Sequence, residues 1–275
     1  MSYSKTVLIA IGGGELAECT EVLEKFFALL EKIPEARIAV LTVATDGVDG
    51  AVKKYNSLFR SRGFRHVNVV DVSIRSDAFD SQALEKIRNA DVLYFTGGDQ
   101  LHVTSLLGGS PLHSLILEKC EKGVIIAGIS AGASMMSSSM IISGRSDTAP
   151  RFGCLEIAPG MNLITDSVID SHFSERGRHG RLLCALAHYP QALGIGIDER
   201  TAIFVRGSEM KVVGESTVTI MDGSRMKHND LPYSNNDEPI AIFDVHTHIL
   251  RSGYKFDLKK RAPVSPSLRT LKASN

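Results

Sequence analysis

The segment around Ser130 has the residue types and the spacing of a nucleophilic serine. Gly128, Ser130 and Gly132 form a GxSxG pattern inside VIIAGISAGAS, where a strand-like run passes into small residues. A serine on a sharp turn between a strand and a helix has a strained backbone, and small neighbours let adjoining segments approach it. Its hydroxyl is then exposed at a helix N-terminus, where the helix dipole favours negative charge. We therefore expect Ser130 to be a nucleophile rather than a serine that only caps a helix.

A nucleophilic serine needs a base, and the strand-like run VIDSHF contains a candidate. The period of two in a strand places Asp170 and His172 on the same face. His172 can accept a proton near neutral pH, although a single histidine on a strand can also be purely structural. Asp198 and Glu199, at the end of the run GIGIDE, could each orient the imidazole, and the spacing alone leaves both open.

Three arginines follow within six residues and could bind an anionic substrate. Arg176, Arg178 and Arg181 precede the apolar residues of an expected helix. Cations near a helix N-terminus are mildly unfavourable unless they bind an anion, and guanidinium groups hold carboxylates in a bidentate manner. We expect the cluster to bind substrate carboxylates, and a solvated helix start is the alternative.

Two further motifs indicate a nucleotide or a metal only weakly. Residues 12–17, GGGELA, fit GxGxxG/A after a strand, but Asp46, the acid at the next strand end, comes later than the spacing of about 20 residues in dinucleotide sites. We expect a tight glycine turn that lines a pocket. His246 and His248 form an HxH pair, yet no histidine or cysteine follows them to complete a metal site. We therefore predict a structural pair and neither a metal nor a cofactor.

An α/β fold must position these residues. Short β-branched runs at 7–11, 38–43, 67–72, 92–95 and 124–129 alternate with stretches of helical periodicity. In the first such stretch, one helical face is formed by Leu16, Leu23, Phe26, Phe27 and Leu30. Continuous apolar strands are typical of a mostly parallel, doubly wound sheet covered by helices on both faces. Ligands bind such sheets at the carboxyl ends of the strands.

Beyond about residue 195 the pattern changes to short strands. The segments AIFVRG, EMKVVG and STVTIMDG each close with glycine, as in an antiparallel β-meander. We expect an antiparallel C-terminal β extension of the same domain over about 195–261, with a loop at 227–238 and a strand at 241–250. One domain would then cover residues 1–261, and residues 262–275 would form a flexible tail.

The composition narrows the classes of function. The chain has 275 residues, with 31 basic and 31 acidic side chains, so its formal net charge is zero. Without a uniform positive field, neither nucleic acid nor an anionic membrane surface is an expected partner. No apolar stretch approaches the roughly 18 residues of a membrane helix, so we expect a soluble protein. Its four cysteines are scattered singly, which favours reduced thiols in the cytoplasm.

Five motifs in order resemble those of cyanophycinases, a serine peptidase family related to aspartyl dipeptidases. They are YFTGGDQ at 94–100, GISAGASMM at 128–136, DSHFSERGRHGRL at 170–182, GIGIDERTA at 194–202 and HILRSGYKFDL at 248–258. The resemblance runs from the first strand to about residue 261. It implies a fold similar to class I glutamine amidotransferases, which is flavodoxin-like, and a homodimer. The shorter aspartyl dipeptidases lack a comparable C-terminal extension.

The resemblance also assigns roles to individual residues. It makes Ser130 the nucleophile, His172 the general base and Glu199, in preference to Asp198, the orienting acid. The backbone N–H groups of Gly98 and Ala131 would form the oxyanion hole. The positions that surround or bind the substrate would be Gln100, Asp170, Ser171, Arg176, Arg178 and Arg181. Two positions depart from the family pattern, because Ser171 replaces a glutamine and Leu182 replaces a basic residue, which weakens the inference about the preferred aspartyl peptide.

These assignments imply hydrolysis of cyanophycin, a polyaspartate backbone with arginine on its side chains, to β-aspartyl-arginine through an acyl-enzyme. A closely related alternative is an aspartyl dipeptidase that acts on short peptides. An α/β-hydrolase esterase would follow the chain order serine, acid, histidine, so its base would be His228, His246 or His248. A non-catalytic protein that binds a nucleotide or small ligand at residues 12–14 is a further alternative.

Overall fold

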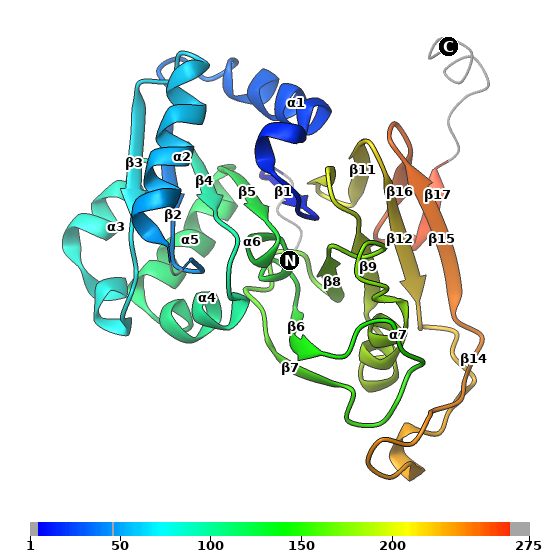
Figure 1. Cartoon of the computed structure of the whole chain (residues 1–275). Coiled ribbons are helices and arrows are strands. Elements are labelled where there is room, and N and C mark those ends of the chain that lie inside the picture. The colour runs from blue at the N-terminus through cyan, green and yellow to red at the C-terminus, as the bar shows by residue number, and fades with distance from the viewer. Residues whose placement is uncertain (1–4, 46, 265–275) are drawn as a thin grey trace, which may run out of the picture.

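The computed structural model describes residues 5–45 and 47–264, and a nine-stranded sheet forms its centre. The strand order is β17-β16-β11-β10-β1-β5-β4-β2-β3 (Figure 1). Five neighbouring strands are parallel: β1 (Val7–Ile11), β5 (Ile125–Ile129), β4 (Val92–Phe95), β2 (Arg37–Leu41) and β3 (His66–Val70). All five coincide with the predicted β-branched runs to within two residues. The mixed α/β architecture with a parallel centre is therefore confirmed.

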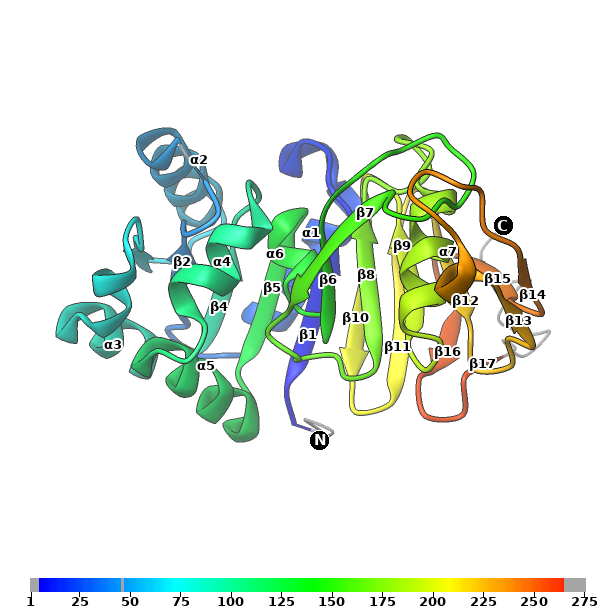
Figure 2. The same cartoon turned by 90° about the horizontal axis from the view of Figure 1, so that it is seen from below.

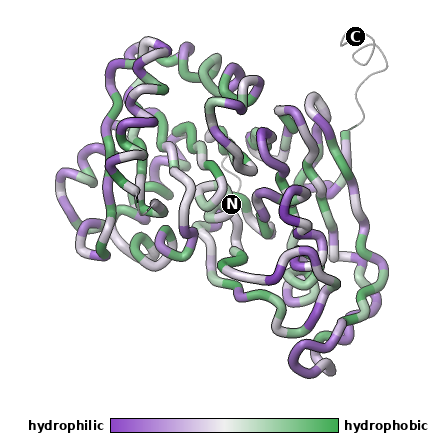
Figure 3. Tube along the Cα trace, viewed as in Figure 1, coloured by the Kyte–Doolittle hydropathy of each residue, from purple (hydrophilic) through white to green (hydrophobic). Residues whose placement is uncertain are grey.

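Helices cover both faces of the parallel strands (Figure 2). One face carries η1 (Leu16–Glu18), α1 (Thr20–Leu30) and α2 (Val48–Ser61); the other carries η2 (Arg75–Phe79), α3 (Ser81–Arg88), α4 (Gln100–Leu107) and α5 (Pro111–Lys122). Apolar and polar residues are interspersed along these helices (Figure 3), as expected when each helix buries one face. Phe26, Phe27, Phe59 and Tyr94 pack edge to face or tilted in the α1–α2 layer. Within the described ranges, no helix has both the length and the apolar character needed to cross a bilayer.

Most of the strands outside the parallel centre lie in two sheets. The main sheet continues through β10 (Thr201–Arg206), β11 (Glu209–Gly214), β16 (Lys255–Asp257) and β17 (Ala262–Val264). A second sheet has the order β15 (His246–Arg251), β12 (Thr217–Asp222), β9 (Leu193–Ile197) and β8 (Ser167–Ser171). The expected continuous meander is therefore wrong at β12, which leaves β11 and pairs with β9. Gly214, at φ +128°, provides the turn at that point.

The C-terminal part of the chain departs from the sequence expectations in three places. The elements not yet named are β6 (Ser139–Gly144), β7 (Leu155–Pro159), β13 (His228–Asn229), η3 (Leu231–Tyr233), β14 (Ile242–Phe243), α6 (Ala131–Ser134) and α7 (His179–His188). The expected loop at 227–238 contains β13, which pairs with β14, and η3, in which Leu231 is buried. The expected strand at 241–250 is split into β14 and β15 at Asp244, whose φ is +65°. Residues 262–264, predicted to belong to the tail, form a strand that pairs with β16, and the rest of the predicted tail, 265–275, lies outside the described residues.

One continuous core joins the two sheets. Leu8 and Phe95 of the main sheet share a hydrophobic cluster with Ile195, Val218 and Ile220 of the second sheet. Beyond this core, the segment after β1 contacts the ends of β8 and β9, through a backbone hydrogen bond from His172 to Gly12 and close packing of Gly12 on Ile197. This continuity supports the predicted single domain over 1–261, which stays a prediction.

A buried ion pair fixes α7 to β8. Asp170, on β8, is 2% exposed. Arg181 donates from Nε to Asp170 Oδ2 at 2.7 Å and from Nη2 to Oδ1, and Arg178 Nη1 lies 3.2 Å from Oδ1. Two guanidinium groups therefore compensate one carboxylate away from water, and they hold the start of α7 against the strand that leads to His172.

We expect Asp170→Asn to lower the free energy of unfolding by about 3–5 kcal/mol, because it leaves two arginines without their buried counter-charge. Urea unfolding measures this loss. Asp237→Asn is the matched control, since its partner Arg145 and Asp237 are each about half exposed and such a pair contributes under about 1 kcal/mol. Equal losses in the two variants would contradict a structural role for the buried pair.

Candidate active site

Ser130 occupies a strained turn between β5 and α6. Its φ is +55°, in the left-handed region that side chains rarely adopt. A β-carbon on Gly128 would lie 2.1 Å from the Gly132 carbonyl oxygen, and one on Gly132 would lie 2.5 Å from the Phe95 carbonyl oxygen. Both glycines of the GxSxG pattern are therefore required by close backbone approach. The turn has the features of a nucleophile elbow.

The imidazole of His172 connects Ser130 to Glu199. His172 follows β8, its Nε2 lies 2.9 Å from Ser130 Oγ, and its Nδ1 lies 2.6 Å from Glu199 Oε1. The His172 side chain is 13% exposed and that of Glu199 is 27% exposed. A hydroxyl, an imidazole and a carboxylate in this order can transfer a proton from serine to histidine while the acid stabilises the resulting imidazolium.

The two acids that the sequence left open as partners of the imidazole have different contacts. Glu199 contacts the imidazole, whereas the carboxylate of Asp198 accepts hydrogen bonds from Ser174, Ser216 and Thr217. The backbone N–H of Glu199 in turn donates to Glu175 Oε1 at 3.1 Å. Neither Glu175 nor the contacts of Asp198 had a signal in the sequence beyond proximity to the motif.

The glycine run after β1 positions the site. The carbonyl oxygens of Ile11, Gly12 and Gly13 accept the backbone N–H groups of Ser130 at 2.9 Å, His172 at 2.8 Å and Arg200 at 3.0 Å, in that order. A β-carbon on Gly13, which has φ +133°, would lie 2.2 Å from Cε1 of His172. Because the imidazole fills the space over the turn, this run does not form the phosphate-binding loop of a dinucleotide site.

Burial lowers the pKa of His172 below its ordinary value. The cations Arg176 and Arg178 lower the pKa further, whereas the hydrogen bond and the charge of Glu199 raise it. The net direction keeps the imidazole neutral at neutral pH. A neutral Nε2 can accept a proton from Ser130, as a general base must.

The loop between β4 and α4 lies beside Ser130. A β-carbon on Gly97 would be 3.4 Å from the Ser130 β-carbon, and Gly98 has φ +138° with Ala44 packed against it. Ala131 is the first residue of α6, so its N–H has no intrahelical acceptor. Of the two residues predicted for an oxyanion hole, Ala131 directly follows the nucleophile and Gly98 follows the glycine that lies beside it.

The other predicted substrate residues differ in exposure. Arg176 is exposed, and Arg181 is 6% exposed and paired with Asp170. Gln100 Nε2 donates to the Ile141 carbonyl oxygen of β6 at 2.8 Å. Ser171 is buried, and its carbonyl oxygen accepts a hydrogen bond from Arg178. The arginine cluster is therefore partly internal, which its sequence did not predict.

Leu182, the second departure from the family pattern, lies in the core. It is fully buried, and a β-carbon on Gly194 of β9 would lie 3.0 Å from its Cγ. The leucine therefore packs α7 against β9 inside the core.

Two of the histidines that the esterase alternative offered as the base pack against phenylalanine rings. The His228 ring stacks on Phe243 with centroids 4.6 Å apart, and His248 packs on Phe256. Since His172 is the imidazole at Ser130, the esterase order of serine, acid, histidine does not apply. Among the described residues, no three histidine, cysteine, aspartate or glutamate side chains gather as a metal site would require.

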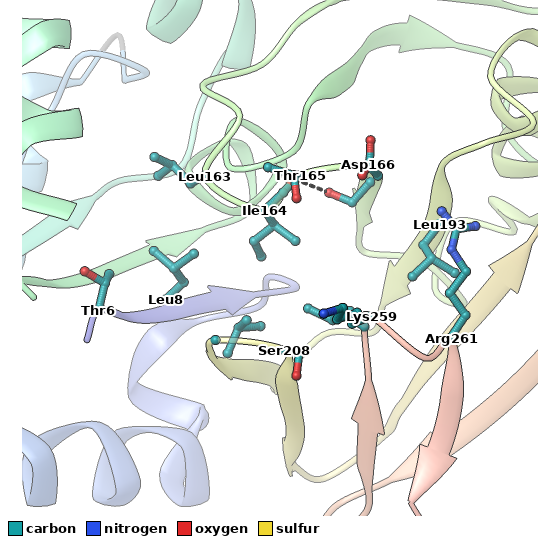
Figure 4. A pocket seen from close by; sticks show the side chains of 14 residues that line it. Thr6, Leu8, Leu163, Ile164, Thr165, Asp166, Leu193, Ser208, Lys259 and Arg261 are labelled. Carbon is teal, nitrogen blue, oxygen red and sulfur yellow. Dashed lines mark hydrogen bonds between the residues drawn. The ribbon is translucent and has the colours of Figure 1, made fainter. Parts of the chain in front are cut away.

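A separate cavity of about 490 Å³ opens at the opposite edge of the sheets (Figure 4). Its lining includes Leu8 at the start of β1, Ser167 at the start of β8, and Lys259 and Arg261 beside β16 and β17. Ser130, His172 and Glu199 do not line it. The cavity is therefore distinct from the candidate active site.

The elbow, the hydrogen-bonded imidazole and the acid define a serine hydrolase built on an α/β sheet. The model of peptidase family S51 matches residues 8–213, and the chain belongs to this family. It is therefore a peptidase.

Individual relatives match over nearly the whole chain. A cyanophycinase from Geminocystis herdmanii is 33% identical over 96% of this chain and 97% of its own, and one from Trichormus variabilis is 33% identical over 94% and 87%. A crystal structure of a peptidase from an acI-B1 Actinobacterium has a TM-score of 0.68 and 22% identity, covering 94% of this chain and 98% of its own. This last likeness concerns the fold.

We expect Gly13→Ala to slow the labelling of Ser130 by a fluorophosphonate about 100-fold, because its methyl group would displace the His172 ring by about 1 Å or more. Mass spectrometry of the labelled peptide gives the rate. Gly50→Ala, in α2, is the control because no atom other than its chain neighbours and its own helix backbone lies within 4 Å of the added carbon, so its labelling rate should equal that of the wild type. Unchanged labelling in Gly13→Ala would show that the ring does not need this space.

Proposed function

We propose that the protein hydrolyses cyanophycin to β-aspartyl-arginine dipeptides, with Ser130 as nucleophile, His172 as general base and Glu199 as the acid that orients it. The observation that supports this proposal best is the hydrogen-bonded series of Ser130 Oγ, His172 and Glu199. Full-length similarity to proteins named cyanophycinase supports the choice of substrate.

The reaction proceeds in two halves. Ser130 Oγ attacks the scissile carbonyl carbon while His172 Nε2 takes the hydroxyl proton, and the N–H groups of Gly98 and Ala131 stabilise the oxyanion. The imidazolium then gives its proton to the leaving amine, and the acyl-enzyme forms. A water molecule that loses its proton to His172 hydrolyses the ester and restores the serine.

The mixed charge of the site suits the mixed charge of this substrate. Each unit carries the carboxylate and the guanidinium of an arginine on an aspartate backbone, so recognition needs cations together with anions or amides. Arg176 is exposed, and Arg178 Nε is buried without a hydrogen-bond partner among the described residues. Burial also lowers the pKa of Arg178 to about 10. A substrate carboxylate would complete the hydrogen bonds of this guanidinium.

The other residues of the proposed substrate region act through their neighbours. They are Gln100, Asp170, Ser171 and Arg181. Asp170 and Arg181 hold each other, so they act by fixing Arg178 and the end of β8. Gln100 acts in the same way on β6.

We also propose a cytoplasmic homodimer, which the family resemblance implies. Four buried, unpaired cysteines among the described residues are compatible with a reducing compartment.

Ser130→Ala should lower turnover of cyanophycin by about 10⁶-fold with folding intact, the loss expected when a triad nucleophile is removed. Product release from insoluble cyanophycin, identified by mass spectrometry, measures turnover, and circular dichroism monitors folding. Free aspartyl dipeptides are assayed in parallel. Turnover of the dipeptides alone by the wild type would assign an aspartyl dipeptidase, and an active Ser130→Ala variant would refute the nucleophile.

The lowered pKa of His172 predicts the acid limb of the pH profile. The base must be neutral, so kcat/KM should fall only as the pH drops through this lowered pKa, with a midpoint below the ordinary histidine value of about 6.5. Arg176→Gln removes a neighbouring cation and should move the midpoint upward. A downward movement, or a wild-type midpoint above the ordinary value, would contradict this account of the base.

A further inference from the structure

We infer that Asp198 is a positioning residue that holds the His172 segment and the Glu199 segment in the register required for proton transfer. The inference rests on the proposed roles of Ser130, His172 and Glu199. Asp198 does not touch the imidazole. It acts through the backbone on either side of it.

The carboxylate of Asp198 accepts four hydrogen bonds from two segments. Ser174 N, two residues beyond His172, donates at 3.0 Å. Ser216 Oγ donates at 2.8 Å, Thr217 Oγ1 at 2.7 Å and Thr217 N at 3.2 Å, from the turn that leads into β12. One side chain thereby ties the loop after His172 to the second sheet.

Backbone contacts also join the Asp198 segment to the His172 segment and to the glycine run after β1. Phe173 N donates to the Ile197 carbonyl oxygen at 3.2 Å, so the His172 and Glu199 segments already touch once beside Asp198. A β-carbon on Gly12 would lie 2.2 Å from the Asp198 carbonyl oxygen. The residue is thus packed against the glycine run whose carbonyl groups bind Ser130, His172 and Arg200.

The charge of Asp198 matters as well as its shape. The residue is 1% exposed, and burial alone would raise its pKa, but the hydrogen bonds from Ser174, Thr217 and Ser216 lower the pKa overall. An ionised carboxylate accepts at both oxygens, whereas an asparagine would turn an N–H₂ group toward one set of donors. Asp198→Asn therefore loosens one of the two segments without removing volume.

The direct test compares Asp198→Asn with Asp222→Asn. Asp222 is also a buried aspartate with a lowered pKa, but it binds Ser224 and Arg261 at the far end of β12. Three readouts are followed: the rate of Ser130 labelling by a fluorophosphonate, the kcat and KM for cyanophycin hydrolysis, and the low-field proton resonance of His172 Nδ1. A purely structural residue would leave the last unchanged in the folded protein.

For Asp198→Asn we expect labelling and kcat to fall about 100-fold with KM nearly constant, and the Nδ1 resonance to shift or broaden. Asp222→Asn should resemble the wild type in all three. Thr217→Val removes one donor and should give a smaller change in the same direction. It carries the test if Asp198→Asn does not fold.

An unchanged kcat, labelling rate and resonance in the folded variants would overturn the inference. The labelling assay separates this outcome from failure of the proposed function, because it does not depend on the natural substrate. If the wild type were labelled at Ser130 but did not cleave cyanophycin, only the substrate assignment would fail.

Discussion

The hydrogen bond between Ser130 and His172 joins two sheets, and its length depends on the end of β1. Ser130 leaves the main sheet and His172 leaves the second sheet, so neither strand pairing alone sets their separation. Consecutive carbonyl groups of Ile11 and Gly12 bind the backbone N–H groups of both residues. Successive Cα atoms are about 3.8 Å apart, so these two contacts hold the backbone of the nucleophile and that of the base close together.

Buried carboxylates hold the segment that carries His172 on both sides. Asp170, two residues before it, binds Arg178 and Arg181 of the following segment, and Asp198 binds Ser174, two residues after it. A buried charge with incomplete partners is strongly unfavourable, so each carboxylate permits few arrangements of its neighbours. Apolar packing of similar volume would tolerate small shifts, whereas these ionic and hydrogen-bonded contacts specify one placement of the imidazole.

The chemistry of the site was easier to predict than the assembly that surrounds it. Ser130 was predictable because its strain imposes small neighbours at fixed spacing. His172 was predicted from a strand-like run, but it follows β8 with φ +48°, so the alternation expected for Asp170 and His172 ends before it. Local patterns did not distinguish Asp198 from Glu199, since adjacent side chains diverge and the groups that they contact lie after β8 and at the start of β12. The predicted pairing of β12 was wrong for the same reason. Segments that close with glycine predict strands and turns, but they contain no information about which strand is the partner.

The glycine run after β1 shows that one sequence pattern can belong to two kinds of turn. Both a phosphate-binding loop and the turn at Gly12 and Gly13 require glycine for close approach, so the letters are the same. What differs is the group that approaches, here the ring of His172 and the backbone at Asp198. Left-handed backbone angles at Ser130, His172 and Arg200 add about 1–3 kcal/mol of strain each, a substantial fraction of a typical folding free energy. Such strain persists only when surrounding contacts over-determine the conformation, and the three carbonyl groups of residues 11–13 supply those contacts at all three positions.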